Sequence, residues 1–67
     1  MMFKLWSEWD IGEELCIFAN KEVGLQWLRN NPNVAEIAEE DKVSVEACIE
    51  SCFADGLFCW QEVTIIQ

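Results

Sequence analysis

The spacing of apolar residues changes along this chain, and that change limits the folds it can adopt. In residues 2–11 every second side chain belongs to a mostly apolar set, namely Phe3, Leu5, Ser7, Trp9 and Ile11. A period of two is typical of a β-strand with one buried face. Further on, apolar positions recur every three or four residues, at Val45, Cys48, Ile49, Cys52 and Phe53. That spacing is typical of one helix face, so the chain must combine strands and helices.

Two more strands are expected. Gly12, flanked by acidic residues, predicts a turn, and residues 15–19 predict a second strand that closes a β-hairpin. Residues 57–66 are rich in aromatic and β-branched side chains, which favours a last strand.

Helices are expected between the second and last strands. Asn20 is a good N-cap for a helix over residues 21–30. Asn33, with Glu36 three residues later, fits a capping-box start for a second helix.

Ser44 caps a third helical segment, which Gly56 ends. The sequence leaves open whether residues 34–54 form one bent helix or two, because residues 41–43 are a weak break.

The expected fold class is therefore α+β. A small three-stranded antiparallel sheet packs against two or three helices in the order β-β-α-(α)-α-β. Residues 1–67 form a single small domain. A chain of this length buries only about 60% of its unfolded surface, so a second copy or a partner could add burial.

The charge balance limits the partners. Thirteen acidic residues oppose four basic ones, which gives a net charge of −9. Because 52% of the residues are hydrophobic, the chain has enough apolar surface to fold rather than remain disordered. A strongly negative surface repels nucleic acid and membranes, and it attracts basic surfaces on other proteins.

The acidic residues fall into two groups that could bind such a partner. The first surrounds the predicted hairpin turn, and the second lies on the outer sides of the later helices. The candidates are Glu8, Asp10, Glu13, Glu14, Glu36, Glu39, Glu40, Asp41, Glu46 and Glu50. Carboxylates on a rigid surface can imitate the phosphates of a nucleic acid. The alternative is an acidic surface that only keeps a small protein soluble.

A second candidate surface is aromatic. If the helices cover one face of the sheet, the other keeps Trp6, Phe18, Phe58 and Trp60. An exposed aromatic patch on a small protein usually marks a contact with a partner or a second copy. The alternative is that the helices cover both faces and bury all four side chains.

Catalysis and metal binding are not expected. The chain has no His, which removes the usual acid–base group near neutral pH. Of the four cysteines, Cys48 and Cys52 lie on the apolar side of a predicted helix, and Cys16 and Cys59 are isolated. We expect reduced thiols, no metal, no cofactor and no enzymatic activity. With no signal peptide and no apolar stretch of membrane-spanning length, a cytoplasmic location is expected.

One set of residues resembles a known group of proteins. The set comprises Leu5 to Glu13 (LWSEWDIGE), Phe18, Lys21-Glu22, Trp27-Leu28, Gly56-Leu57 and Glu62-Val63. It is similar to small uncharacterised proteins of bacteriophages and other bacterial mobile elements, which open with a "SEWDIG"-like hairpin. The helix that carries Cys48 and Cys52 departs from that pattern.

The resemblance implies an accessory protein acting in the cytoplasm of an infected bacterial host. It also implies that the protein binds and inhibits a host nucleic-acid-handling enzyme or defence complex, as anti-CRISPR and anti-restriction proteins do. The alternative is a structural or regulatory homodimer without an enzymatic target.

Overall fold

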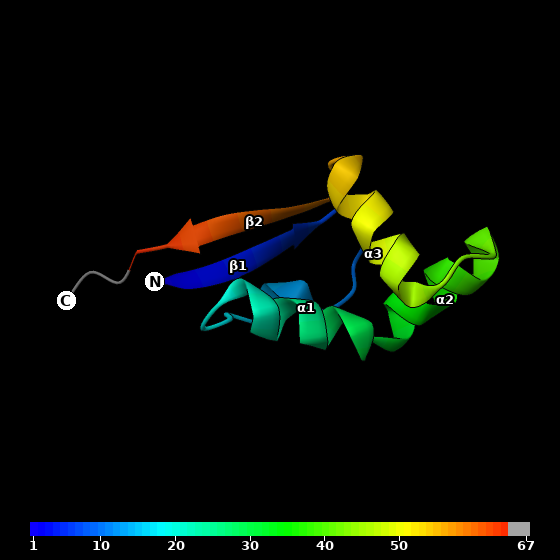
Figure 1. The fold of residues 1–67 in the computed structure, drawn as a ribbon. Coiled ribbons are helices and arrows are strands. Elements are labelled where there is room, and N and C mark those ends of the chain that lie inside the picture. Colours follow the sequence, from blue (N-terminus) through cyan, green and yellow to red (C-terminus); the bar gives the residue numbers. More distant parts are fainter. Residues whose placement is uncertain (65–67) are drawn as a thin grey trace.

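The computed structural model describes residues 1–64, and its first and last strands lie side by side (Figure 1). The elements in chain order are β1 (Met2–Ser7), the 3₁₀ turn η1 (Glu13–Leu15), α1 (Lys21–Arg29), α2 (Pro32–Asp41), α3 (Val45–Ala54) and β2 (Phe58–Val63). The strands form a two-stranded antiparallel sheet in which Leu5 lies opposite Trp60. The α+β class is confirmed. The predicted strand residues 65 and 66 lie outside the described part.

The predicted three-stranded sheet is wrong, because residues 15–19 do not form a strand. Gly12 takes a left-handed conformation (φ 87°) that leads into η1. The only pairing of this segment is one bridge, in which Phe3 and Phe18 each donate an N–H to the other's carbonyl oxygen, both at 2.8 Å. The apolar residues Leu15 and Ile17 are exposed, so the alternation in this segment does not indicate a buried strand face.

The first strand ends at Ser7 rather than at Ile11, for a local reason. The Trp9 N–H donates to Ser7 Oγ (3.0 Å), and the Ile11 N–H donates to Glu13 Oε2 (3.2 Å). These side-chain acceptors satisfy backbone donors that a longer strand would need to pair with another strand.

The helix boundaries largely follow their capping residues. Asn20 Oδ1 accepts from the Val23 N–H (2.9 Å), and Ser44 Oγ accepts from the Ala47 N–H (3.1 Å), so both predicted caps are confirmed. The predicted Asn33 cap is wrong. Asn31 caps α2, because Pro32 suits the first helical turn, where its missing N–H is not needed.

α2 and α3 are separate helices. Lys42 takes a left-handed conformation (φ 57°), and the Val43 N–H donates to the Ala38 carbonyl oxygen (3.0 Å), which closes a Schellman motif. Gly56 (φ 76°) ends α3 in the same way, with the Leu57 N–H donating to the Cys52 carbonyl oxygen (2.8 Å).

The core lies between one face of the sheet and the helices. Its buried side chains are Leu5, Ile11, Phe18, Leu28, Val34, Ala38, Cys48, Ile49, Cys52 and Phe58. α1 approaches the sheet closely because Gly24 has no side chain. A Cβ there would lie 2.7 Å from Trp60 Cζ3 and 3.2 Å from Phe18 Cδ2.

The molecule is elongated, with extents of 45 × 20 × 19 Å. The free end of the strand pair forms one end, and α2 lies at the other (Figure 1). Within residues 1–64, no helix combines the length and the apolar character needed to cross a lipid bilayer.

Candidate protein-interaction surfaces

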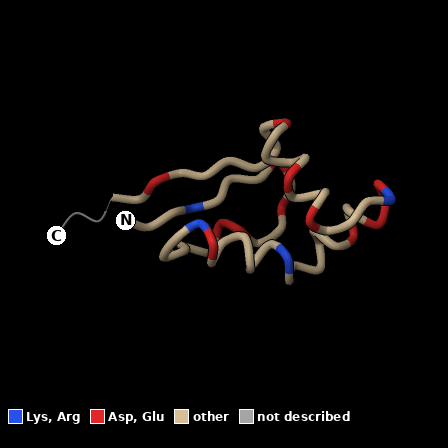
Figure 2. The backbone as a smooth tube through the Cα atoms, in the orientation of Figure 1, with Lys and Arg blue, Asp and Glu red and all other residues tan. Residues whose placement is uncertain are grey.

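Four exposed carboxylates lie between the middle and the C-terminal end of α2, at the end of the molecule farthest from the free ends of the strands (Figure 2). We call Glu36, Glu39, Glu40 and Asp41 the α2 acidic end. Glu39 and Glu40 lie three and four residues after Glu36, so both are on the same side of the helix as Glu36. Within the described residues, no basic side chain forms an ion pair with any of the four.

The position of these carboxylates is unfavourable for the helix that carries them. A helix presents a partial negative charge at its C-terminal end, where basic residues stabilise it and acidic residues do not. α2 has no acidic residue in its first turn and no basic residue in its last turn, and its last residue is Asp41. Glu36 and Glu40 add a like-charge pair at a spacing of four. This arrangement lowers the stability of α2.

Glu46, on α3, differs from the α2 carboxylates because it forms an ion pair with Arg29. The Arg29 Nε–H donates to Glu46 Oε1, and Arg29 Nη1 lies 3.4 Å from Glu22 Oε1. The hydrogen bond to Glu46, followed by the attraction of both carboxylates, raises the pKa of Arg29. Arg29 therefore partly neutralises this side of the molecule. Glu50, also on α3, is exposed.

The acidic group near the predicted hairpin turn is divided by burial. Glu8, Asp10 and Glu14 are exposed, whereas Glu13 is buried and accepts from the Ile11 N–H. Asn31 Nδ2 donates to the Ile11 carbonyl oxygen (2.9 Å), so both backbone groups of Ile11 are bonded to side chains. Glu13 holds this loop, and its carboxylate is not available to a partner.

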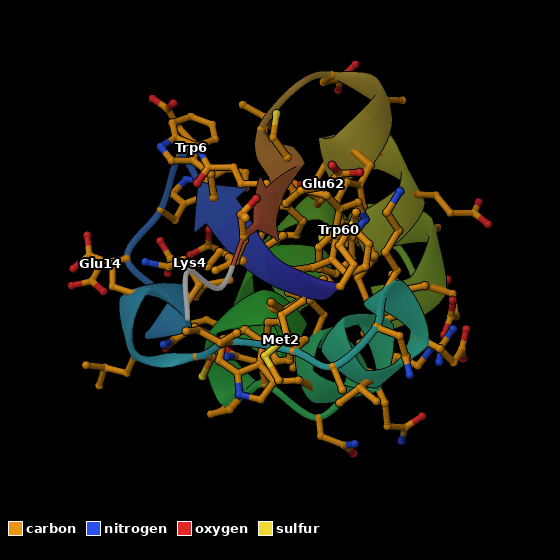
Figure 3. The ribbon with its side chains drawn as sticks, turned by 90° about the vertical axis from the view of Figure 1, so that its left-hand side faces the viewer. Met2, Lys4, Trp6, Glu14, Trp60 and Glu62 are labelled. Carbon is orange, nitrogen blue, oxygen red and sulfur yellow. The ribbon has the colours of Figure 1, made fainter. Side chains whose placement is uncertain are left out.

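The predicted exposed aromatic face does not form. Phe18 and Phe58 are buried in the core, and Trp60 stacks on Phe53 with ring centroids 5.3 Å apart. Of the four predicted aromatic residues, Trp6 is the one that lies on the outer face of the sheet, where it is 42% exposed. Figure 3 shows Trp6 on the side of the strands that faces away from Trp60.

The expectation that Phe58 and Trp60 lie on the sheet face away from the helices is wrong. Phe58 and Trp60 face the helices, whereas Cys59 and Val63 share the outer face with Trp6. Side-chain volume is the signal that could have indicated this, because the larger aromatic residues fill the space between the sheet and the helices. The outer face of the sheet, with Met2, Lys4, Trp6, Cys59, Gln61 and Val63, is the surface that sequence reasoning missed.

The thiols show no sign of a reactive site. Burial, followed by the neighbouring Cys48, raises the pKa of the Cys52 thiol to about 11, so this group is neutral at physiological pH. A small cavity of about 200 Å³ borders both thiols, and its polar lining includes Asp41, Ser51 and Asp55. Among residues 1–64, no three metal-ligating side chains come together.

Comparison with known proteins gives no relative from which a function could be transferred. No family model, no curated protein and no solved structure matches this chain.

Proposed function

We propose that this protein is a non-catalytic binding module that docks its acidic surface onto a basic surface of a partner protein. The observation that carries the proposal is the α2 acidic end, where exposed carboxylates occupy the helix terminus at which they are least favourable. Each such charge costs about 0.3–1 kcal/mol. Solubility alone would be served equally well by carboxylates in the first turn, where they stabilise the helix.

The α2 acidic end is also held rigidly, which favours recognition of a specific partner. Both ends of α2 are fixed, by the Asn31 cap and by the Schellman motif at Lys42, so the spacing of its carboxylates is rigid. A rigid array of negative charge accelerates association with a basic surface and selects against acidic partners. Trp6, exposed on the sheet, provides a separate apolar contact for the same partner or another one.

The partner that we propose is a host nuclease or another nucleic-acid-binding complex. Its groove is basic because it must hold phosphates, and carboxylates can occupy such a groove in their place. The resemblance of LWSEWDIGE and the closing strand to phage and mobile-element proteins supports a host target, as in anti-CRISPR or anti-restriction inhibition. The net charge of −9 disfavours direct binding to nucleic acid or to an acidic membrane.

The test compares two variants that carry the same net charge. In the first, Glu39→Gln, Glu40→Gln and Asp41→Asn neutralise the α2 acidic end. A tagged protein is first used to capture partners from a nuclease-treated bacterial lysate at low and high salt, and the purified partner is then titrated by calorimetry. We expect the triple variant to weaken binding at least tenfold at low salt and to raise the thermal stability of the free protein.

The control variant carries Glu8→Gln, Asp10→Asn and Glu14→Gln, which remove three exposed carboxylates from the loop before α1. We expect the control to retain most of the affinity. An equal loss in both variants would show that only net charge matters. Full affinity in the α2 variant would exclude the α2 acidic end as the binding surface.

A further inference from the structure

The outer edge of β2 offers unpaired backbone groups. In an antiparallel sheet, one residue of a strand directs both its N–H and its C=O toward the neighbouring strand on one side. The next residue directs both groups toward the opposite side. Phe3 exchanges both hydrogen bonds with Phe18, so it directs them away from β2. Glu62 lies opposite Phe3, and its N–H and C=O therefore point away from β1.

The same alternation assigns the rest of the strand. Trp60 and Phe58, opposite Leu5 and Ser7, also direct their backbone groups away from β1. Phe58 is buried, so the accessible outward residues of this edge are Trp60 and Glu62. The bond from the Glu8 N–H to the Leu57 carbonyl oxygen (2.9 Å) continues the pattern beyond the end of the strands. Within residues 1–64, no chain segment pairs with this edge, and Figure 1 shows α1 on the other side of the strand pair, next to β1.

This edge lacks the features that usually prevent pairing between sheet edges. Natural edge strands carry Pro, a bulge or several charges. β2 has an uninterrupted register over its six residues, contains no Pro and carries one charge, Glu62. Its other residues include Phe58, Trp60 and Val63, which favour strands.

We propose that β2 pairs edge to edge with β2 of a second copy, giving a four-stranded antiparallel sheet about a two-fold axis. An axis at Gln61 places Trp60 opposite Glu62 of the other copy. The pairing then uses the two accessible outward residues and avoids a direct contact between like charges. An axis at Glu62 would bring two carboxylates together.

The charge distribution permits this dimer despite the net charge of −9. β2 runs from α3 toward the free end of the strand pair, so antiparallel pairing sends the helical parts of the two copies in opposite directions (Figure 1). The two α2 acidic ends then lie far apart, well beyond the screening length of about 8 Å at physiological salt. The strands themselves carry one Lys and one Glu, which balance.

The interface is small. Pairing of one short strand buries less than the roughly 800 Å² per partner of a standard interface. We therefore expect a dissociation constant of about 1–100 μM rather than a permanent dimer. The dimer goes beyond the proposed function, because it would present two acidic ends to a partner whatever that partner is.

The first test is sedimentation velocity from about 1 to 500 μM, with a reductant present to prevent a disulfide through the exposed Cys59. Glu62→Pro removes an outward N–H but leaves the pairing with β1 intact, because Pro is tolerated at a free strand edge. Glu62→Ala removes the same charge and keeps the N–H. We expect the wild type and Glu62→Ala to dimerise and Glu62→Pro to remain monomeric at every concentration.

The second test needs no variant. Backbone amide exchange is measured by NMR below and above the dimerisation midpoint. The amides of Trp60 and Glu62 should gain at least tenfold protection at high concentration, whereas that of Gln61, already paired with Lys4, should change little. A wild-type protein that stays monomeric up to 500 μM would overturn the proposal. So would a dimer in which the Trp60 and Glu62 amides stay unprotected.

Discussion

Replacing Gly24 by Ala should destabilise the protein, although Ala favours a helix over Gly. At an exposed position in the middle of a helix, the substitution stabilises by about 1 kcal/mol. Gly24 is buried in α1, and an added Cβ would lie 2.7 Å from Trp60 Cζ3 and 3.2 Å from Phe18 Cδ2. Carbon atoms in a packed core are normally separated by about 3.5–4.0 Å.

The size of the effect follows from these two opposing terms. Overpacking a core costs about 1–3 kcal/mol, and this position lies at the upper end because Trp60 is a rigid ring already stacked on Phe53. After subtracting the gain in helix propensity, we expect a net loss of about 2 kcal/mol. For a domain of this length, that corresponds to a fall in Tm of about 10 °C.

The assay is thermal and urea unfolding of four proteins: the wild type, Gly24→Ala, Trp60→Leu and the double variant. Leu is smaller than Trp and leaves room for the new methyl group. Gly24→Ala should therefore be neutral or stabilising in the Trp60→Leu background, with a coupling energy of about 2 kcal/mol. If Gly24→Ala raises Tm in the wild-type background, the close packing of α1 on Trp60 does not prevent a larger side chain at position 24, and the reasoning is refuted.

Three further changes test other parts of the structure. Asn31→Ala removes both the cap of α2 and the hydrogen bond to the Ile11 carbonyl oxygen. It should lower the free energy of unfolding, measured by urea titration, by about 1–3 kcal/mol. The control is Asn33→Ala, at an exposed position of the same helix. Lys42→Gly should instead raise the free energy of unfolding by up to about 1 kcal/mol, since glycine takes the left-handed conformation (φ 57°) without strain, and this gain exceeds the loss of the basic charge at the C-terminal end of α2. An unchanged or lower Tm would contradict this. Burial raises the pKa of the Cys52 thiol to about 11, so the folded protein binds this proton more tightly than the unfolded chain does. The contribution of Cys52 to the free energy of unfolding should therefore be constant below the ordinary thiol pKa near 9 and decrease as the pH rises toward 11. When unfolding is measured under reducing conditions, the decrease in the free energy of unfolding between pH 7 and pH 10.5 should be smaller for Cys52→Ala than for the wild type.

Elements that depend on local chemistry were predictable from the sequence. α1 and α3 follow from their caps at Asn20 and Ser44 and from the spacing of their apolar residues. The sequence predicts a strand over the residues of β2 but not its buried face, because each set of alternating side chains combines apolar residues with one polar residue. Which set turns inward depends on the space between Gly24 and Phe53, and that space exists only in the folded protein.

The absent third strand has a similar explanation. Residues 15–19 alternate like a strand, but a neighbouring segment supplies one bridge, at Phe18, and no more. Strand propensity depends on pairing partners that lie far away in the sequence. For the same reason, composition identified the acidic candidates but not their environments. The burial of Glu13 and the pairing of Glu46 with Arg29 depend on tertiary contacts.

The pairing of β1 with β2 also sets a constraint on folding during synthesis. β1 leaves the ribosome first, but its partner is not available until Phe58 to Val63 have been translated. The three helices can form in the meantime, whereas Leu5 must wait for Trp60 and Phe58. Contacts of such long sequence separation slow folding. The nascent chain therefore leaves Leu5 without its packing partners until β2 has been synthesised, and a ribosome stalled before that point should carry a chain sensitive to proteases.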